Sequence, residues 1–194
     1  MSHNLKIKKV ESLVMPHLPY LHRVARRFCN NRSDADDLVH DLLVKLFEQP
    51  DLIERVEYLK TWLVRCLYNL YIDGVRKNSK TVAMEPETIQ EIIESGSSAQ
   101  IKTLEEIKDL EQLNVVLGRL LSNLPATQRA IVVLHDMEGY QLSELATQLD
   151  IPIGTVKSRL HRGRERLKAL LIEAGYGKLE QENDSNNNAN DGNL

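Results

Sequence analysis

The sequence predicts an all-α protein made of two small helical domains joined by a flexible acidic linker. Three observations support this fold class. Helix-forming residues dominate the middle of the chain. Only 5% of the residues are aromatic and 9 are glycine, which is untypical of an all-β protein. Apolar residues recur at helical spacing in both halves, and 194 residues are enough for two small cores.

The charge pattern indicates where the two domains and the linker between them begin and end. Residues 81–112 contain eight acidic residues against two basic ones, although the net charge of the chain is only -3. We expect these residues to link an N-terminal domain at 1–80 to a C-terminal domain at 113–175. The Asn-rich tail at 176–194 has too little apolar surface to fold, and we expect it to be disordered.

Two helices dominate the N-terminal domain. The first is expected to start at Ser33, whose hydroxyl would cap it, and to end before Pro50. The second is expected over 58–77. Their apolar residues fall on one face of each helix: Leu38, Val39, Leu42, Leu43, Leu46 and Phe47 in the first, and Leu59, Leu63, Leu67, Leu70 and Ile72 in the second. Trp62 is expected to be a core aromatic residue.

The C-terminal domain has the pattern of a helix-turn-helix. A helix opening at Pro125 is expected to end at residues 138–140, and a short amphipathic helix follows over 142–149. Residues 150–154 form the turn before a last helix. The buried stripe of that helix has helical spacing: Val156, Leu160, Gly163 and Leu167.

The opposite face of the last helix is basic. Residues 155–168 contain six basic residues against one acidic residue. A solvated basic face is the commoner meaning of such a run, but the helix and turn before it favour DNA, because Arg and Lys donate to guanine acceptors in the major groove. The predicted DNA-binding residues are Thr155, Lys157, Ser158, His161 and Arg162.

Several motifs resemble those of one family. Residues 124–129 (LPATQR), 138–140 (EGY) and 154–162 (GTVKSRLHR) resemble the promoter-binding C-terminal domain of extracytoplasmic-function sigma factors. Residues 34–41 (DADDLVHD) resemble the helix with which this family grips the clamp of RNA polymerase. Residues 61–65 (TWLVR) and those after them resemble the helix that engages the melted downstream promoter element. The resemblance covers about residues 13–171, in family order.

The resemblance implies two further sets of site residues. The polymerase-binding set is Asp36, Asp37, His40 and Asp41. The DNA-binding set of the N-terminal domain is Asn69, Asp73, Arg76 and Lys77. The spacing of the second set supports its role, because these residues share one helix face, where an amide can bond an unpaired base and the cations can hold the backbone.

The chain also departs from the family pattern at two places. Asp150 stands in the turn where the family usually has glycine, and aspartate tolerates the left-handed conformation better than most residues. Gly163 stands where the family usually has alanine. Glycine in place of alanine would cost about 1 kcal/mol of helix stability. Neither change removes a predicted contact residue.

These observations predict a sigma factor that binds core RNA polymerase and directs promoter recognition and transcription initiation. The alternative is a stand-alone helix-turn-helix repressor or activator, which would dimerise on palindromic duplex DNA. A DNA-processing enzyme is disfavoured, because the six histidines have no ligand spacing and the chain has no glycine-rich phosphate loop. We therefore expect no catalytic residue, no metal and no cofactor.

The expected setting is a reducing cytoplasm. The two cysteines, Cys29 and Cys66, stand in helical sequence without a CxxC partner, and buried structural thiols are favoured over redox sensors. The longest apolar runs are too short to span a bilayer, so no membrane insertion is expected. The expected partners are core RNA polymerase, promoter DNA and, as in many relatives, an anti-sigma factor. The free protein is expected to be a monomer.

Overall fold

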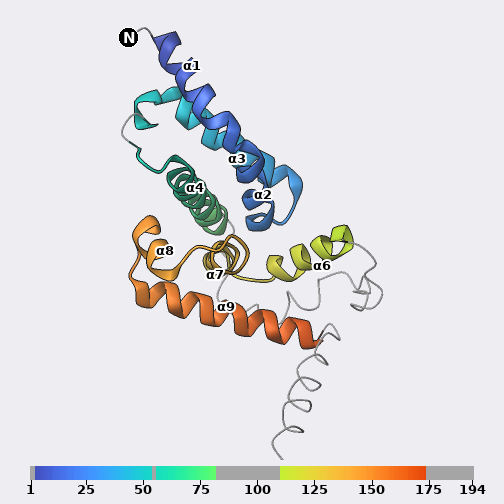
Figure 1. Ribbon diagram of the computed structural model, residues 1–194. Helices are drawn as coiled ribbons and strands as arrows, with labels where there is room; N and C mark the ends of the chain where they lie inside the picture. Colours follow the sequence, from blue (N-terminus) through green and yellow to red (C-terminus); the bar gives the residue numbers. More distant parts are fainter. Residues whose placement is uncertain (1–2, 54–55, 82–109, 174–194) are drawn as a thin grey trace, which may run out of the picture.

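The computed structural model describes residues 3–53, 56–81 and 110–173, and every regular element among them is helical (Figure 1). The all-α prediction is therefore confirmed for the described residues. Most of the expected acidic linker and the whole Asn-rich tail lie outside them. None of the described helices is both long and apolar enough to cross a membrane.

The N-terminal half is a bundle built on three helices, α2, α3 and α4, with α1 packed along one side (Figure 1). The sequence pattern did not indicate α1, and α4 runs four residues past the predicted end of its helix. The elements are α1 (His3–Val14), η1 (Met15–His17), α2 (Leu18–Phe28), α3 (Arg32–Glu48), η2 (Pro50–Ile53) and α4 (Leu59–Thr81).

The cap of α3 differs from the prediction. Asn31 has an extended backbone (φ -141°, ψ 168°), and its side chain accepts a hydrogen bond of 2.8 Å from the backbone N–H of Asp34. The predicted cap, Ser33, is already inside the first turn of the helix. Asn31 is therefore the capping residue, because a cap must lie outside the helix for its side chain to reach back to a free N–H.

The C-terminal half contains the predicted helix-turn-helix, formed by α7, α8 and α9. Asp150 ends α8 in the left-handed conformation (φ 55°, ψ 50°), as the sequence predicts for this turn. The elements are α6 (Leu110–Ser122), α7 (Ala126–Val132), the π-helical turn η4 (Val133–Met137), α8 (Leu142–Leu149) and α9 (Ile153–Glu173).

Gly163 has a packing role that the sequence did not reveal. It is buried, and a Cβ atom built on it would lie 2.7 Å from Cγ2 of Val132. The absence of a side chain thus lets α9 lie close against α7. The helix-propensity cost of this glycine is offset by a contact that alanine could make only if Val132 moved.

The two halves pack against each other. α2 and α4 of the N-terminal half contact α6, α7, η4 and α8 of the C-terminal half (Figure 1). Buried apolar residues of both halves form one continuous cluster, in which the rings of Phe28 and Tyr71 stack with centroids 5.1 Å apart. This packing sets how the candidate binding faces lie relative to one another.

Candidate nucleic-acid interface and the contact between the halves

The predicted DNA-binding face of α9 is largely open to solvent. Lys157, His161 and Arg162 are exposed, whereas Thr155 and Ser158 are half-buried. The hydroxyl of Ser158 donates to the backbone carbonyl of Thr155 at 3.1 Å. The predicted stripe on the opposite side of α9 faces the core, where Val156, Leu160 and Gly163 are buried and Leu167 is partly buried.

The predicted face of α4 is exposed as well. Asn69, Asp73, Arg76 and Lys77 are all exposed along residues 69–77 of the helix. A carboxylate oxygen of Asp73 lies 3.8 Å from Nη1 of Arg76, within the same face. The structure therefore brings this set together on one accessible surface, next to the C-terminal half.

The predicted polymerase-binding set is divided. Asp37, His40 and Asp41 are exposed on α3. Asp36 instead turns toward α2, where its carboxylate lies 3.2 Å from Nδ1 of His22. The same carboxylate lies 3.6 Å from Nε of Arg32, four residues earlier on α3. Three of the four residues thus share an accessible face, and the fourth is engaged on the neighbouring side.

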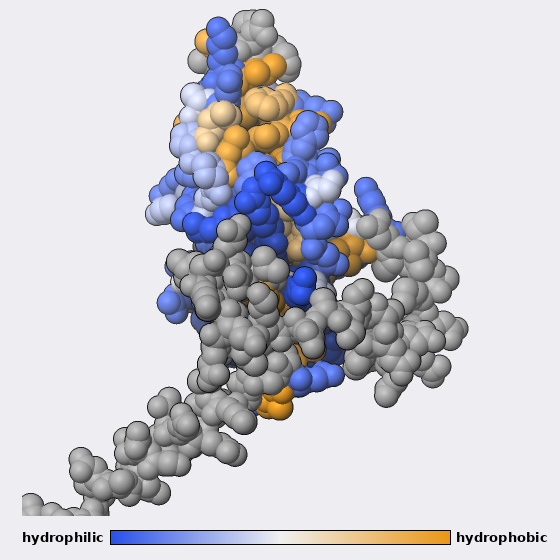
Figure 2. All heavy atoms as spheres, turned by 90° about the vertical axis from the view of Figure 1, so that its right-hand side faces the viewer, coloured by the Kyte–Doolittle hydropathy of each residue, from blue (hydrophilic) through white to orange (hydrophobic). Residues whose placement is uncertain are grey.

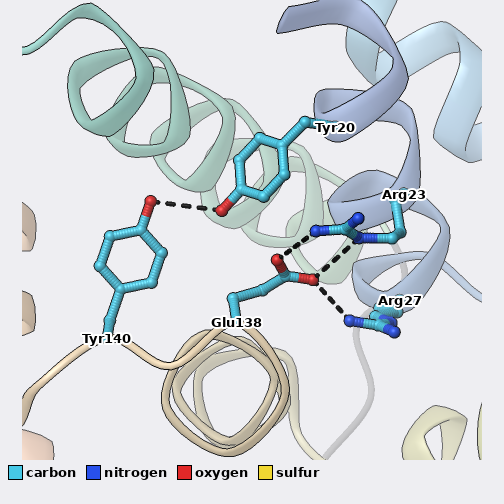
Figure 3. Close-up of polar contacts among 5 residues, drawn as sticks. All are labelled: Tyr20, Arg23, Arg27, Glu138 and Tyr140. Atoms are coloured by element: carbon cyan, nitrogen blue, oxygen red, sulfur yellow. Dashed lines mark hydrogen bonds and ion pairs between the residues drawn. The ribbon is translucent and has the colours of Figure 1, made fainter.

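A buried carboxylate joins the two halves (Figure 3). The side chain of Glu138, which directly follows η4, is only 2% exposed. It accepts hydrogen bonds from Arg23 at 2.8 and 3.3 Å and from Arg27 at 2.5 Å, both on α2. The bond to Glu138 also raises the pKa of the Arg23 guanidinium. Charge-assisted bonds of this kind are the stronger class of hydrogen bond.

A pair of tyrosines extends this contact (Figure 3). The hydroxyl oxygens of Tyr20 and Tyr140 are 3.2 Å apart. Arg23 and Lys60 lie over the Tyr20 ring, at 5.0 and 4.2 Å from its centroid. Burial is the main cause of the raised pKa of Tyr20, and the bond to Tyr140 adds to it. We call Tyr20, Arg23, Arg27, Glu138 and Tyr140 the Glu138 cluster.

Arg129 forms a second junction. Its side chain is buried, and its two terminal nitrogens donate to Phe28 O and Asn30 Oδ1 at 2.6 Å each, to Ser122 O at 2.6 Å and to Leu124 O at 3.1 Å. Phe28 and Ser122 end α2 and α6, so the guanidinium lies where the partly negative C-termini of two helices meet. Burial lowers the pKa of Arg129, because it disfavours the charged form.

Sequence reasoning missed both junctions. The sequence predicts a helix that opens at Pro125 and ends at residues 138–140, which describes the local structure of these residues but not their partners. One signal was present, since Arg23 and Arg27 stand at i and i+4 and so share a helix face. The partner on the other half could not be named from that spacing.

The two cysteines carry free thiols. Burial raises the pKa of Cys29 to about 11, and the charge of Asp34 adds to the shift. Burial also raises the pKa of Cys66. A thiol needs to be deprotonated to react, so neither residue has the lowered pKa that is typical of a redox sensor.

In a Cys66→Ser variant, Cys29 is expected to react with a thiol reagent at pH 8 about tenfold or more slower than a free cysteine. The low thiolate fraction slows the reaction more than the greater nucleophilicity of a high-pKa thiolate speeds it. Reaction rates measured from pH 7 to 11 should keep rising toward the pKa of about 11. A plateau near pH 8.5 would contradict this expectation.

Family models match the chain in two places. The model of sigma-70 region 2 matches residues 13–81, and the model of sigma-70 region 4 matches residues 115–167. The first match covers most of the N-terminal half, and the second covers the helix-turn-helix. A region 2 followed by a region 4 defines a promoter-recognition factor of bacterial transcription, which is not an enzyme.

Two relatives show to which branch of the sigma-70 family the chain belongs. The chain is 33% identical over 170 residues to the ECF RNA polymerase sigma factor SigE of Mycolicibacterium smegmatis, covering 84% of this chain and 62% of the relative. It is 30% identical over 161 residues to SigM of Mycobacterium tuberculosis, covering 83% and 76%. The chain belongs to the extracytoplasmic-function sigma factors of the sigma-70 family, which direct RNA polymerase to promoters.

Two solved structures have a fold similar to that of this chain. The sigma factor RpoE of Bartonella quintana, in complex with the anti-sigma factor NepR, aligns with a TM-score of 0.59 and 26% identity over 85% of this chain and 98% of that one. CnrH, in complex with the cytosolic domain of CnrY, aligns with a TM-score of 0.56 and 22% identity over 88% and 95%. The second likeness supports the fold alone.

Proposed function

We propose that this sigma factor reads a promoter with two separate faces, one on each half, while it is bound to core RNA polymerase. The α9 face, with Lys157 and Arg162 at its centre, reads duplex DNA in the major groove. The α4 face, from Asn69 to Lys77, holds the melted strand. The observation that carries this proposal is that both faces are exposed even though the two halves are packed together.

The exposed residues of the predicted polymerase-binding set, on α3, are the third part of the proposal. Asp37, His40 and Asp41 would contact basic residues of core polymerase, whereas Asp36, which lies 3.2 Å from His22, would orient the helix. The proposed boundaries remain 1–80 for the polymerase-docking domain, 81–112 for the linker and 113–175 for the duplex-reading domain. Two weak, salt-sensitive DNA contacts joined on polymerase gain affinity through a raised effective concentration.

Charge reversal on α3 tests this proposal. An Asp37→Lys/Asp41→Lys variant is expected to bind core polymerase about 30-fold or more weakly, because like charges across an interface cost several kcal/mol. The matched control is Glu11→Lys/Glu57→Lys, which makes the same charge change at exposed acids elsewhere. The measurement is a pulldown of core polymerase followed by transcription from a promoter library.

The outcomes separate this function from its main alternative. Core binding with new transcription start sites, lost only in the α3 variant, supports the proposal. A free protein that ignores core polymerase and binds a palindromic duplex as a dimer would instead be a conventional repressor or activator. Equal loss of core binding in both variants would remove the α3 face from the proposal.

We also propose that an inhibitory protein partner controls this factor. The support is the likeness to the Bartonella quintana sigma factor, whose structure was solved in complex with an anti-sigma factor. A partner that contacted both halves at once would hold them together. Such a partner would shift the population toward the packed arrangement, because it would bind that arrangement in preference to a separated one.

A further inference from the structure

The buried stripe of α9 continues past the point where the core covers it. After the buried Gly163, the same helix face carries Leu167, Leu170 and Leu171, at i+4, i+7 and i+8. Leu167 is partly buried against the core, Leu170 is half-buried and Leu171 is 37% exposed. Figure 2 shows apolar residues at the foot of the described chain, which is the height of the end of α9 in Figure 1. We call Leu167, Leu170 and Leu171 the α9 apolar end.

The start of α6 lies near this surface. α6 contacts α9, and the first residues of α6 and the last residues of α9 are on the same side of the molecule (Figure 1). Leu120 of α6 is 5% exposed, although it does not belong to the continuous apolar cluster of the core. Apolar burial on α6 is therefore not limited to the core, and the chain that enters α6 arrives beside the α9 apolar end.

The residues that enter α6 have an amphipathic pattern. Residues 101–109 directly precede α6 and contain Ile101, Leu104 and Ile107, whose spacing of i, i+3 and i+6 places them on one face of a helix. The acidic residues of this stretch fall on the opposite face: Glu105, Glu106 and Asp109. An apolar face of this width is typical of a segment that packs on another apolar surface.

The length of this stretch fits the position of the surface. Nine residues in a helix extend about 14 Å, whereas the axes of packed helices are about 8–10 Å apart. A segment joined to α6 at Leu110 can therefore reach α9 without displacing either helix. The other apolar stretch of the linker, residues 89–93, is separated from α6 by 16 further residues, 94–109, so its effective concentration at α9 is lower.

We propose that residues 101–109 dock on the α9 apolar end and so belong to the C-terminal half. Their apolar face covers Leu170 and Leu171, and their acidic face points to solvent. The chain that is free to span the two halves then shortens from residues 82–109 to residues 82–100, which lowers its greatest reach by about 30 Å at about 3.4 Å per residue. This docking thus limits how far the two DNA-binding faces can separate on a promoter. That consequence rests on the proposed function, whereas the docking itself does not.

Hydrogen exchange of the full-length protein, followed by mass spectrometry, tests the docking. The amides of residues 101–109 are expected to exchange at least tenfold slower than those of a synthetic peptide with the same sequence. In a Leu171→Asp variant they should exchange within about twofold of that peptide, because a carboxylate would lie in the apolar contact. Ile172→Asp is the matched control. Ile172 is 56% exposed and lies outside the stripe, so its variant should keep the protection.

Two variants of the segment itself leave α9 unaltered. Leu104→Asp/Ile107→Asp should remove the protection, whereas Glu105→Gln/Glu106→Gln, on the opposite face, should keep it. The exchange of α7 amides should stay the same in all variants, which shows that the C-terminal half remains folded. If Leu171→Asp also accelerates exchange in α7, the comparison between the two segment variants decides.

Four results would overturn the proposal. They are fast exchange of residues 101–109 in the unaltered protein, equal loss of protection in Ile172→Asp, protection that survives in Leu171→Asp, and protection that falls on dilution. The third would mean that the segment only prolongs α6, and the fourth that a second copy covers α9. The experiment contains neither polymerase nor DNA, so its failure would leave the proposed function intact.

Discussion

Replacing Arg129 with methionine is expected to lower the free energy of unfolding by about 3–5 kcal/mol, because the variant removes all four hydrogen bonds while the side-chain volume stays similar. Three backbone carbonyls, those of Phe28 and Leu124 in buried bonds and that of Ser122 in a part-buried one, would lose this donor together. The C-termini of α2 and α6 would also lose the cation that lies between them.

Urea unfolding of the full chain measures this loss, and two further variants show where it comes from. Arg129→Lys should recover only part of the stability, since an ammonium group lacks the forked geometry that reaches four acceptors. Arg166→Met, at an exposed position of α9, should change stability by less than about 0.5 kcal/mol. A loss below about 1 kcal/mol at Arg129 would mean that water replaces the guanidinium there.

Local structure was largely predictable from the sequence because it depends on neighbours along the chain. The apolar stripe of α3, the left-handed Asp150 and the buried stripe of α9 follow from helical spacing and from the conformations that each residue type tolerates. The capping of α3 was predicted two residues too late, because Asn31 and Ser33 are both good capping residues and the sequence does not decide between them.

The contact between the halves could not be predicted, because its partners stand far apart in the sequence. Arg23 and Glu138 are separated by 115 positions, and Arg129 and Phe28 by 101. These groups meet only where the two helical halves pack against each other. Asp36 illustrates the same limit, since the motif placed it with Asp37 but its partner His22 lies on another helix.

The packed arrangement leaves the proposed binding faces open and fixes their relative position. Nη1 of Arg159, on α9, lies 3.3 Å from the hydroxyl of Tyr68 on α4. Arg65 of α4 lies 4.0 Å from the carboxylate of Asp150 in the helix-turn-helix turn. The two helices that carry the proposed DNA-binding faces thus contact each other directly. A change in their spacing requires the contact between the halves to open, and Glu138, whose side chain is 2% exposed, is a charged group within that contact.

The Glu138→Gln substitution is therefore expected to weaken the contact between the halves by about 2–3 kcal/mol. The amide keeps the shape of the side chain but leaves Arg23 and Arg27 facing each other without a counter-charge. The loss should be smaller than for a fully buried pair, because Arg23 is 55% exposed and water can solvate it. Small-angle scattering or energy transfer between labels on the two halves would detect the larger separation.

The matched control for this substitution lies within the C-terminal half. Asp136 forms an ion pair with Arg164 that does not cross between the halves, and both side chains are partly exposed. Asp136→Asn should leave the separation unchanged and cost less than about 1 kcal/mol of stability. An Arg27→Met/Glu138→Gln double variant should lose less than the sum of its two single variants, since each substitution removes the same bond. Strictly additive losses, or an unchanged separation in Glu138→Gln, would mean that the bonds of Glu138 do not hold the halves together.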